Sequence, residues 1–163
     1  MSVTVRVART EEYAEVGDLT ARVYIDAGFM GADTPYVADL RDAAGRGRDA
    51  VLLVAVDAHD RLVGSVTYAT HGDAYAELAG PGEAEFRMLV VDSSARKLGT
   101  GTALVRACLD LARRDGCATM RLSTSPEMVA AHRLYERLGF RRTPERDWTP
   151  APGHDLLAYA LPG

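Results

Sequence analysis

Residues 96–105 read RKLGTGTALV, a basic pair followed by two glycines that flank one threonine, and then by an apolar run. The apolar positions continue at helical spacing; they are Leu104, Val105, Cys108, Leu111 and Ala112. Immediately upstream, residues 84–91 read AEFRMLVV, a run typical of a strand. The sequence therefore predicts a strand, a glycine-rich turn and a helix in that order.

The glycine turn is a candidate anion site. Backbone N–H groups in the first turn of a helix have no helical partner, and the positive end of the helix lies beside them. Gly99 and Gly101 permit a positive φ and a close approach of an anion, while Arg96 and Lys97 add positive charge. The amides able to converge on one anion are those of Leu98, Gly99, Thr100, Gly101 and Thr102. Taken alone, the turn is equally consistent with an ordinary helix start.

Two better-known phosphate motifs do not match. A Walker loop requires GxxxxGK[ST], and the dinucleotide-binding turn requires GxGxxG followed by an acidic residue after the next strand. Neither spacing occurs at residues 96–105.

The N-terminal third of the chain predicts one strand and two helices. Residues 3–9 alternate apolar and polar side chains, which indicates a half-buried strand. Thr10 precedes an acidic and then periodic run, so a helix capped by Thr10 is expected to continue to about Tyr24. Thr34 can cap a second, shorter helix over 35–44, which starts with Pro35 and ends at the glycine-broken GRGR.

The middle of the chain predicts a hairpin and a loop. Residues 50–70 form two β-rich runs joined by a turn near His59 and Asp60, so the two strands should pair antiparallel. Residues 71–83 mix glycine, proline and acids without a period, which indicates a loop and a candidate rim of a site.

The C-terminal third predicts three strands and a helix. A strand is expected over 118–124 and a helix over 126–140, ended by Gly139. Two last strands, at 140–146 and 156–161, surround a turn that contains Pro150, Pro152 and Gly153. Hairpins early and strand-helix units later indicate an α+β (mixed α/β) sandwich of helices on a twisted sheet. We expect one domain over residues 1–163.

Composition excludes several classes of protein. A net charge of -4 leaves no positive field with which to hold a nucleic acid backbone. The longest apolar run, residues 50–56, is too short to span a membrane, so a cytoplasmic protein without a membrane partner is expected. Cys108 and Cys117 have no spacing suited to zinc, which favours two small core residues and no metal.

A third motif follows the glycine turn by about thirty residues. With the strand before residue 92 and the turn RKLGTG, the sequence HRLYERLGF at 132–140 makes an ordered set that resembles the GNAT superfamily of N-acetyltransferases. Arg96, Gly99 and Gly101 match the family's [QR]xxGx[GA] pattern. The family's lYexxGF pattern is matched by Leu134, Tyr135, Glu136, Gly139 and Phe140.

The resemblance implies a fold and a reaction. It implies the GNAT fold, a twisted mixed sheet of six or seven strands with about four helices. It also implies acetyl-CoA as co-substrate, with its pyrophosphate on the glycine turn, and no metal. In this family the acetyl group passes to an amine by direct attack in a ternary complex, and the acceptor here would be a small molecule or a peptide.

The resemblance also assigns roles to residues outside the turn. Backbone groups of Leu89, Val90 and Val91 would pair with the pantetheine amides like an added strand. Tyr135 matches the position of the general acid that protonates the departing thiolate. Its alternative is a core tyrosine on a buried helical stripe.

Glu85 is the candidate general base. An amine with a pKa near 10.4 must lose a proton before it attacks, and Glu85 lies eleven residues before Arg96, where some family members carry a catalytic glutamate. Burial near Phe86 and Met88 would raise the Glu85 pKa and suit it to this role. The alternative is a glutamate on the solvent side of a strand. Glu83 and Glu77 are weaker candidates, and several family members use a water chain instead.

One position departs from the family pattern. Met128 stands where family members often have an asparagine that contacts the cofactor, so that contact is in doubt. Hydroxyls at residues 123–125 could substitute for it, or could serve turn and capping chemistry alone. His132 could line the site or be a partly exposed helix residue.

The acceptor is not identified by the sequence. Acidic residues at Asp73, Glu77, Glu83 and Glu85 hint at a cationic acceptor, although such charges are often solvated surface. A non-catalytic acyl-CoA sensor with the same fold is the main alternative function, and transfer of a longer or acidic acyl group is another. A homodimer is common for the fold.

Overall fold

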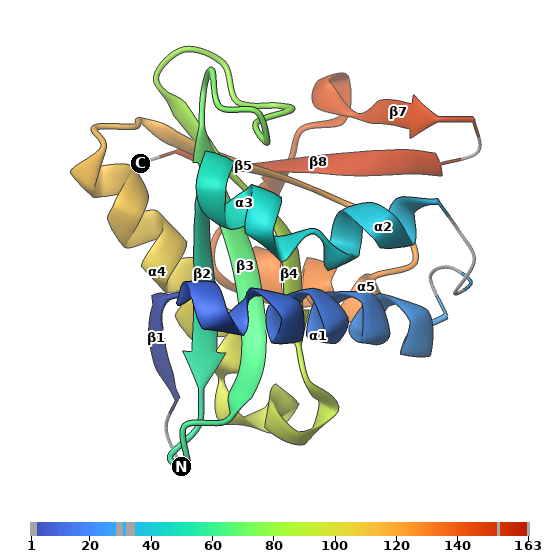
Figure 1. The fold of residues 1–163 in the computed structure, drawn as a ribbon. Helices are drawn as coiled ribbons and strands as arrows, with labels where there is room; N and C mark the ends of the chain where they lie inside the picture. The colour runs from blue at the N-terminus through green and yellow to red at the C-terminus, as the bar shows by residue number, and fades with distance from the viewer. Residues whose placement is uncertain (1–2, 29–30, 32–34, 153, 163) are drawn as a thin grey trace. The chain divides into compact units, whose positions relative to one another are not determined.

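The computed structural model describes residues 3–28, 31, 35–152 and 154–162 (Figure 1). These residues form eight β-strands and five α-helices, so the strand count exceeds the expected six or seven. The chain divides into two compact units, Met1–Tyr68 with Met88–Cys108 (unit 1) and Ala69–Arg87 with Leu109–Gly163 (unit 2). The mixed α+β architecture is as predicted.

Three antiparallel strands open unit 1. β1 (Thr4–Val7) pairs with β2 (Val51–Val56), and β2 pairs with β3 (Leu62–Thr70). The predicted hairpin between β2 and β3 is confirmed, and Asp60 takes the left-handed conformation with a φ of 60°. The Asp57 carboxylate accepts the His59 and Arg61 N–H groups at 2.8 and 3.0 Å, which closes this turn.

The first helix begins differently from the prediction. Residues Thr10–Glu12 form a 3-10 turn, η1, before α1 (Tyr13–Asp26). The group that satisfies the start of η1 is the Glu12 carboxylate, which accepts the Arg9 N–H at 2.8 Å. Thr10 is thus not the cap, because its hydroxyl donates to Glu11 instead.

The predicted helix over 35–44 is two helices, α2 (Tyr36–Arg41) and α3 (Ala43–Asp49). Asp42 caps α3 by accepting the Gly45 N–H at 3.0 Å, and α3 runs through the GRGR segment expected to end it. Buried Arg46 explains this, because its guanidinium donates to Asp39 O and Leu40 O at the end of α2. The expected Thr34 cap lies outside the described residues.

Helices and strands of unit 1 share an apolar core. α1 and α3 lie over β2 and β3, and α1 runs across these strands (Figure 1). One cluster joins the two layers; its buried members are Ala8, Val16, Ala43, Leu52 and Val54. The last part of β4 (Glu83–Val91), the 3-10 turn η2 (Ser93–Leu98) and the first part of α4 (Thr100–Arg114) complete this unit.

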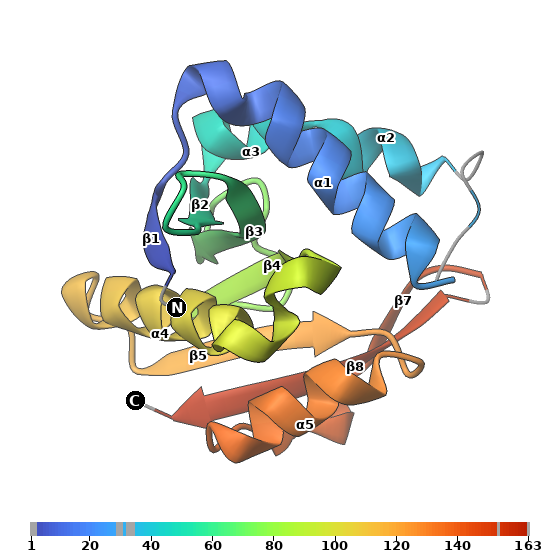
Figure 2. The ribbon, with the colours of Figure 1, turned by 90° about the horizontal axis from the view of Figure 1, so that it is seen from below.

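Unit 2 contains the remaining strands of the sheet and the last helix. The first part of β4 pairs in parallel with β5 (Thr119–Thr124), and β5 pairs antiparallel with β8 (His154–Pro162). β6 (Arg141–Arg142) and β7 (Trp148–Ala151) also pair with β8. α5 (Val129–Arg137) lies alongside β8 (Figure 2).

The strand expected over 140–146 is only partly formed. β6 ends at Arg142, and Pro144–Arg146 form a 3-10 turn, η3. Pro144 has no N–H to give to a ladder, and the Arg142 guanidinium binds the Asp147 carboxylate at 2.7 and 2.8 Å across this turn. The ion pair therefore holds a bend where the sequence suggested an extended strand.

Both cysteines are unpaired, with Cys108 buried and Cys117 half-buried. Burial raises the pKa of the Cys108 thiol. In the part of the chain that the structure describes, no cluster of three His, Cys, Asp or Glu side chains could hold a metal ion. No described helix is both long enough and apolar enough to cross a membrane.

Candidate acyl-CoA and acetyl-transfer site

Every residue predicted to bind the co-substrate lies in one continuous segment of unit 1, from the end of β4 through η2 into α4. Gly99 separates η2 from α4 and has a φ of 73°. Apart from Gly99 and its two chain neighbours, no described residue has a heavy atom within 4 Å of where a Cβ at Gly99 would lie. Ala103 N donates to Gly99 O at 2.9 Å, so the amides of Gly101 and Thr102 precede this bond and belong to the first helical turn.

The residues of the turn fit a diphosphate in chemistry and shape. Gly99 leaves open space, the first turn of α4 presents its N–H groups, and the Arg96 side chain is exposed. Leu98 is half-buried, and Lys97 lies within η2. Gly101 has helical backbone inside α4, so the turn itself depends on Gly99 alone.

Two hydrogen bonds shape this turn from behind. The Thr100 hydroxyl is buried and donates to Ala95 O at 2.9 Å, so only the amide of Thr100 is left for an anion. Asp92 caps η2 by accepting the Ser94 N–H at 3.1 Å, and it accepts Arg22 from α1 at 2.9 Å. The Ser94 and Arg22 contacts lower the pKa of the Asp92 carboxyl. The sequence signal for Asp92 was present, since Asp before a helical turn is a common cap.

The strand before the turn is irregular at Met88. Met88 has a φ of 56°, a conformation that costs a residue with a Cβ about 1 kcal/mol or more. Its side chain packs with Ala21, Val37 and Leu40 beneath α1 and α2, which holds the residue in place. Leu89, Val90 and Val91 follow this irregularity, and Val90 is buried while its two neighbours are half-buried.

Glu85 in unit 2 is fully buried, with 0% of its surface exposed, so the solvent-side alternative is wrong. Its Oε1 accepts three successive N–H groups of the loop, from Glu77 at 2.8 Å, Leu78 at 2.7 Å and Ala79 at 3.0 Å. Its Oε2 is buried with no hydrogen-bond partner among the described residues. Burial raises the Glu85 pKa, against the opposing effect of the three N–H groups and of Arg87.

The neighbouring acids are occupied within unit 2. Glu83 Oε1 accepts Arg121 Nε and the Gly80 N–H, both at 2.8 Å, and these bonds lower the Glu83 pKa. Asp73 accepts the Thr70 N–H at 2.8 Å, and Glu77 lies 3.7 Å from Arg87. These carboxylates therefore have partners within the protein, and the cationic acceptor that they suggested stays a prediction.

Tyr135 is 5% exposed and lies in an aromatic cluster of unit 2. Its ring centroid is 5.8 Å from that of Phe86, 6.0 Å from Phe140 and 6.1 Å from Tyr159. Phe86 directly follows Glu85 on β4, so the Phe86 ring that packs on Tyr135 and the Glu85 carboxylate project from opposite faces of the strand. The Tyr135 ring is thus a core residue, as the alternative held, and this position does not exclude an acid role for its hydroxyl.

One hydroxyl of the cluster and His132 make local contacts. The Thr124 hydroxyl donates to Met128 Sδ at 3.4 Å. The backbone carbonyl of Ser125 accepts the Met128 N–H at 3.1 Å and lies 3.0 Å from His132 Nε2. The turn and capping alternative therefore describes Thr124, while a cofactor contact by the Ser123 and Ser125 hydroxyls stays a prediction.

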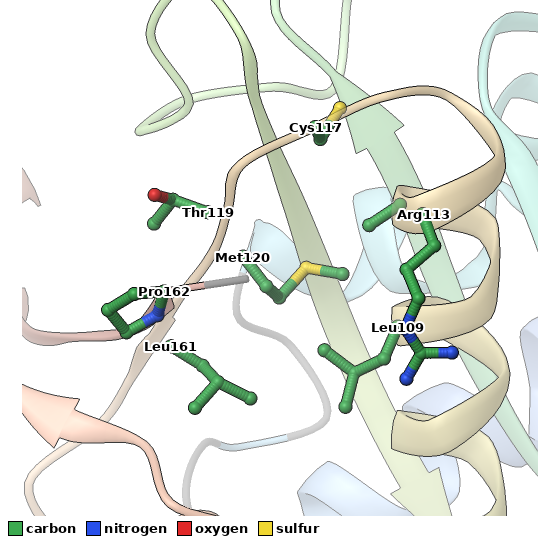
Figure 3. Close-up of a pocket in the computed structure, with 8 residues that line it drawn as sticks. Leu109, Arg113, Cys117, Thr119, Met120, Leu161 and Pro162 are labelled. Carbon is green, nitrogen blue, oxygen red and sulfur yellow. The ribbon is translucent and has the colours of Figure 1, made fainter.

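A separate apolar pocket of about 240 Å³ lies in unit 2 (Figure 3). It is lined by Leu109, Ala112, Arg113, Cys117, Thr119, Met120, Leu161 and Pro162. None of the residues predicted to bind acetyl-CoA or to catalyse transfer is among them.

Comparison with known proteins agrees with the ordered motifs. The family model described as acetyltransferase (GNAT) family matches residues 18–140. The chain therefore belongs to the GNAT family of acetyltransferases, and the resemblance seen in the sequence is confirmed.

Curated relatives share part of their length with this chain. An uncharacterized N-acetyltransferase of Schizosaccharomyces pombe is 31% identical over 102 residues, which are 63% of this chain and 58% of the relative. An N-acetylaspartate synthetase of Danio rerio is 39% identical over 69 residues, which are 42% of this chain and 24% of the relative. The match thus covers 58% of the length of the first relative and 24% of the length of the second.

Solved structures with the same fold match nearly end to end. A GNAT-family acetyltransferase of Staphylococcus aureus aligns with a TM-score of 0.79 and 15% identity over 99% of both chains. The PaiA N-acetyltransferase of Thermoplasma acidophilum, solved in complex with coenzyme A, aligns with a TM-score of 0.77 and 15% identity over the whole of both chains. The predicted GNAT fold is thereby confirmed.

Proposed function

We propose that this protein is an acetyl-CoA-dependent N-acetyltransferase that passes the acetyl group directly to an amine of a small molecule or peptide. The observation that carries the proposal is the segment in which irregular β4 runs into the exposed Gly99 turn and then the first turn of α4. We further propose that it acts in the cytoplasm and without a metal. A homodimer is the oligomeric state to test for.

The turn and the strand would hold the co-substrate. Amides from Leu98 to Thr102 would bind the pyrophosphate, with Arg96 and Lys97 adding charge, and Leu89, Val90 and Val91 would offer backbone groups to the pantetheine arm. The co-substrate would supply the acetyl group as a thioester. Its binding fixes the position of the carbonyl carbon and lowers the entropic part of the barrier.

Glu85 and Tyr135 would move the protons. Glu85 Oε2 accepts no hydrogen bond from any described residue, so it is the oxygen available to accept the proton of the acceptor ammonium. Burial keeps the Glu85 pKa above its usual range, which makes the carboxylate a stronger base near neutral pH. The Tyr135 hydroxyl would donate a proton to the departing sulfur.

The test is an assay of acetyl transfer from acetyl-CoA to a panel of amines. Two quantities are measured, the release of free thiol and the mass of the product. The panel should begin with α-amino acids, because relatives named N-acetylaspartate synthetase share 39% identity over 69 residues with this chain. Tyr135→Phe should lower kcat by about tenfold to a thousandfold with coenzyme A affinity unchanged. Tyr13→Phe, a matched change on α1, should leave both unchanged.

The alternative function, an acyl-CoA sensor, is separated by the same assay. Tight binding of acetyl-CoA with neither transfer nor hydrolysis across the panel would favour the sensor. Full turnover in Tyr135→Phe would remove this residue from the mechanism while leaving the enzyme assignment in place.

A further inference from the structure

The two oxygens of Glu85 have different surroundings. Oε1 accepts N–H groups from three successive residues, Glu77, Leu78 and Ala79, at 2.7 to 3.0 Å. Three consecutive amides that converge on one oxygen form an anion-binding concavity of the backbone, called a nest. Oε2 is equally buried but has no partner among the described residues. The nest therefore fixes the orientation of the carboxylate and leaves one oxygen available.

The nest does not stand alone, because the loop that forms it is attached to the sheet at its far end. Gly80, the residue after the nest, donates its N–H to Glu83 Oε1 at 2.8 Å. The same oxygen accepts Arg121 Nε from β5 at 2.8 Å. Glu83 and Glu85 are two residues apart on β4, so their side chains lie on one face of the strand.

Two further contacts hold the carbonyls of the nest residues. Arg146 in η3 donates to Leu78 O, and His71 Nδ1 lies 2.9 Å from Ala79 O. Leu78 and Ala79 are themselves buried. The nest is therefore fixed through its amides by Glu85, through its carbonyls by Arg146 and His71, and at its end by Glu83.

We propose that Glu83 is a positioning residue for Glu85: by holding Gly80, it keeps the Glu77–Ala79 nest on Oε1, so that Oε2 alone receives the proton. This inference rests on the proposed role of Glu85 as the base. It assigns no contact with substrate to Glu83, which acts through the loop. It also explains why a second carboxylate, that of Glu83, lies on the same face of β4 and has its Oε1 bound to both Arg121 and the Gly80 N–H.

Two substitutions of Glu83 separate the effect of its side-chain length from the effect of its charge. Glu83→Asp keeps the negative charge beside Arg121 but loses one methylene, so the carboxylate no longer reaches Gly80 N. Glu83→Gln keeps the length and an acceptor oxygen but removes the charge. Positioning predicts that Asp releases the nest and Gln retains it, whereas a purely electrostatic role predicts the reverse. The charged and titratable groups around Glu85 are His71, Glu77, Glu83, Arg87, Arg121 and Arg146.

The experiment measures amide hydrogen exchange and the 13C carboxyl titration of Glu85 in the full chain. These two measurements need no substrate. In Glu83→Asp, exchange at residues 77–79 should speed up at least tenfold, and the Glu85 pKa should rise by roughly one unit for each lost N–H. The acid limb of kcat/KM against pH should shift upward by the same amount. Glu15→Asp, the same shortening on an exposed side chain of α1 in unit 1, should change none of the three.

Several outcomes would overturn the inference. Unchanged exchange and an unchanged Glu85 titration in Glu83→Asp contradict it, as does release of the nest in Glu83→Gln but not in Glu83→Asp. If Glu83→Asp does not fold, Gly80→Pro deletes the same hydrogen bond from the loop side and must give the same shift. Full turnover in Glu85→Gln would remove the base role, while the titration would still decide whether Glu83 holds the nest.

Discussion

Glu85 shows how burial and hydrogen bonding compete at a single carboxyl group. Burial raises its pKa, and three N–H groups that favour the charged form oppose that rise. The balance leaves a buried carboxylate that the loop orients and whose Oε2 has no hydrogen-bond partner among the residues the structure describes. A general base needs these properties together.

Glu85→Gln is the direct test at this residue. The amide oxygen of Gln can still accept the loop N–H groups, so the fold and coenzyme A affinity should persist while kcat falls by about a hundredfold to ten-thousandfold. The acid limb of the pH–rate profile should vanish as well, because the group that titrates there is gone. Glu15→Gln, the same change on an exposed carboxylate of α1, serves as control. Retention of the acid limb in Glu85→Gln would point to another base.

Gly99 and Gly116 form a matched pair for testing the turn. Their φ values are 73° and 72°. Beyond the chain neighbours of each glycine, no described residue has a heavy atom within 4 Å of where an added Cβ would lie. Gly99→Ala and Gly116→Ala should therefore lose similar stability, about 1 kcal/mol each, measured by urea unfolding. Only Gly99→Ala should weaken coenzyme A binding, by roughly tenfold, in calorimetry. Equal affinities for the two variants would show that the turn does not hold the pyrophosphate.

At the level of elements, strands and helices with strong periodicity were predictable. The β2–β3 hairpin, β4, β5 and α4 follow from alternation, turn residues and helical spacing in the sequence. The division of residues 35–49 into α2 and α3 was not, because it depends on Arg46 reaching the carbonyls of Asp39 and Leu40. Such a contact exists only after the chain has folded.

The site divides in the same way. The family motifs predict roles for the turn and Tyr135, and the spacing from Arg96 predicts one for Glu85; these roles stay predictions. The engagement of Glu83 with Gly80 and Arg121, from the loop and another strand, leaves no local signal. The positive φ at Met88 could not be predicted from the sequence either, because a methionine within a strand pattern predicts a regular extended backbone.

Gly17 tests how closely α1 packs on α2. A Cβ at Gly17 would lie 2.2 Å from Arg41 O, a backbone atom that cannot move aside without shifting α2. Ala normally stabilises a helix relative to Gly by about 1 kcal/mol, but here Gly17→Ala should destabilise the protein by roughly 2 kcal/mol or more. Glu15→Ala on the exposed face of α1 should change stability by less than about 0.5 kcal/mol. Denaturant midpoints check both, and a stabilised Gly17→Ala would contradict the packing.

For the molecule as a whole, the Arg6–Glu12 pair predicts a pH dependence of unfolding. The guanidinium of Arg6 binds both Glu12 oxygens at 2.8 Å and lowers the Glu12 pKa from 4.5 to about 2. A lowered carboxyl pKa stabilises the fold above pH 4.5, and that contribution is lost as the pH falls through 2. Its upper limit at neutral pH is about 3 kcal/mol.

Thermal unfolding between pH 2 and 7 measures this contribution. Glu12→Gln should lower the midpoint at pH 7, and its difference from the parent protein should shrink to nearly nothing at pH 2. Glu11→Gln, the adjacent exposed carboxylate, should run parallel to the parent at every pH. A Glu12→Gln deficit that is constant with pH would mean that the ion pair is not its cause.

The two thiols differ enough to make chemical labelling selective without mutagenesis. Cys108 is sealed inside the protein and its raised pKa keeps it uncharged, whereas Cys117 is half-buried at the edge of the apolar pocket (Figure 3). A maleimide dye should therefore attach once, at Cys117, and report through its emission on whatever enters that pocket. The natural sequence therefore carries one accessible thiol for a fluorescent label, and this thiol is outside the proposed glycine turn.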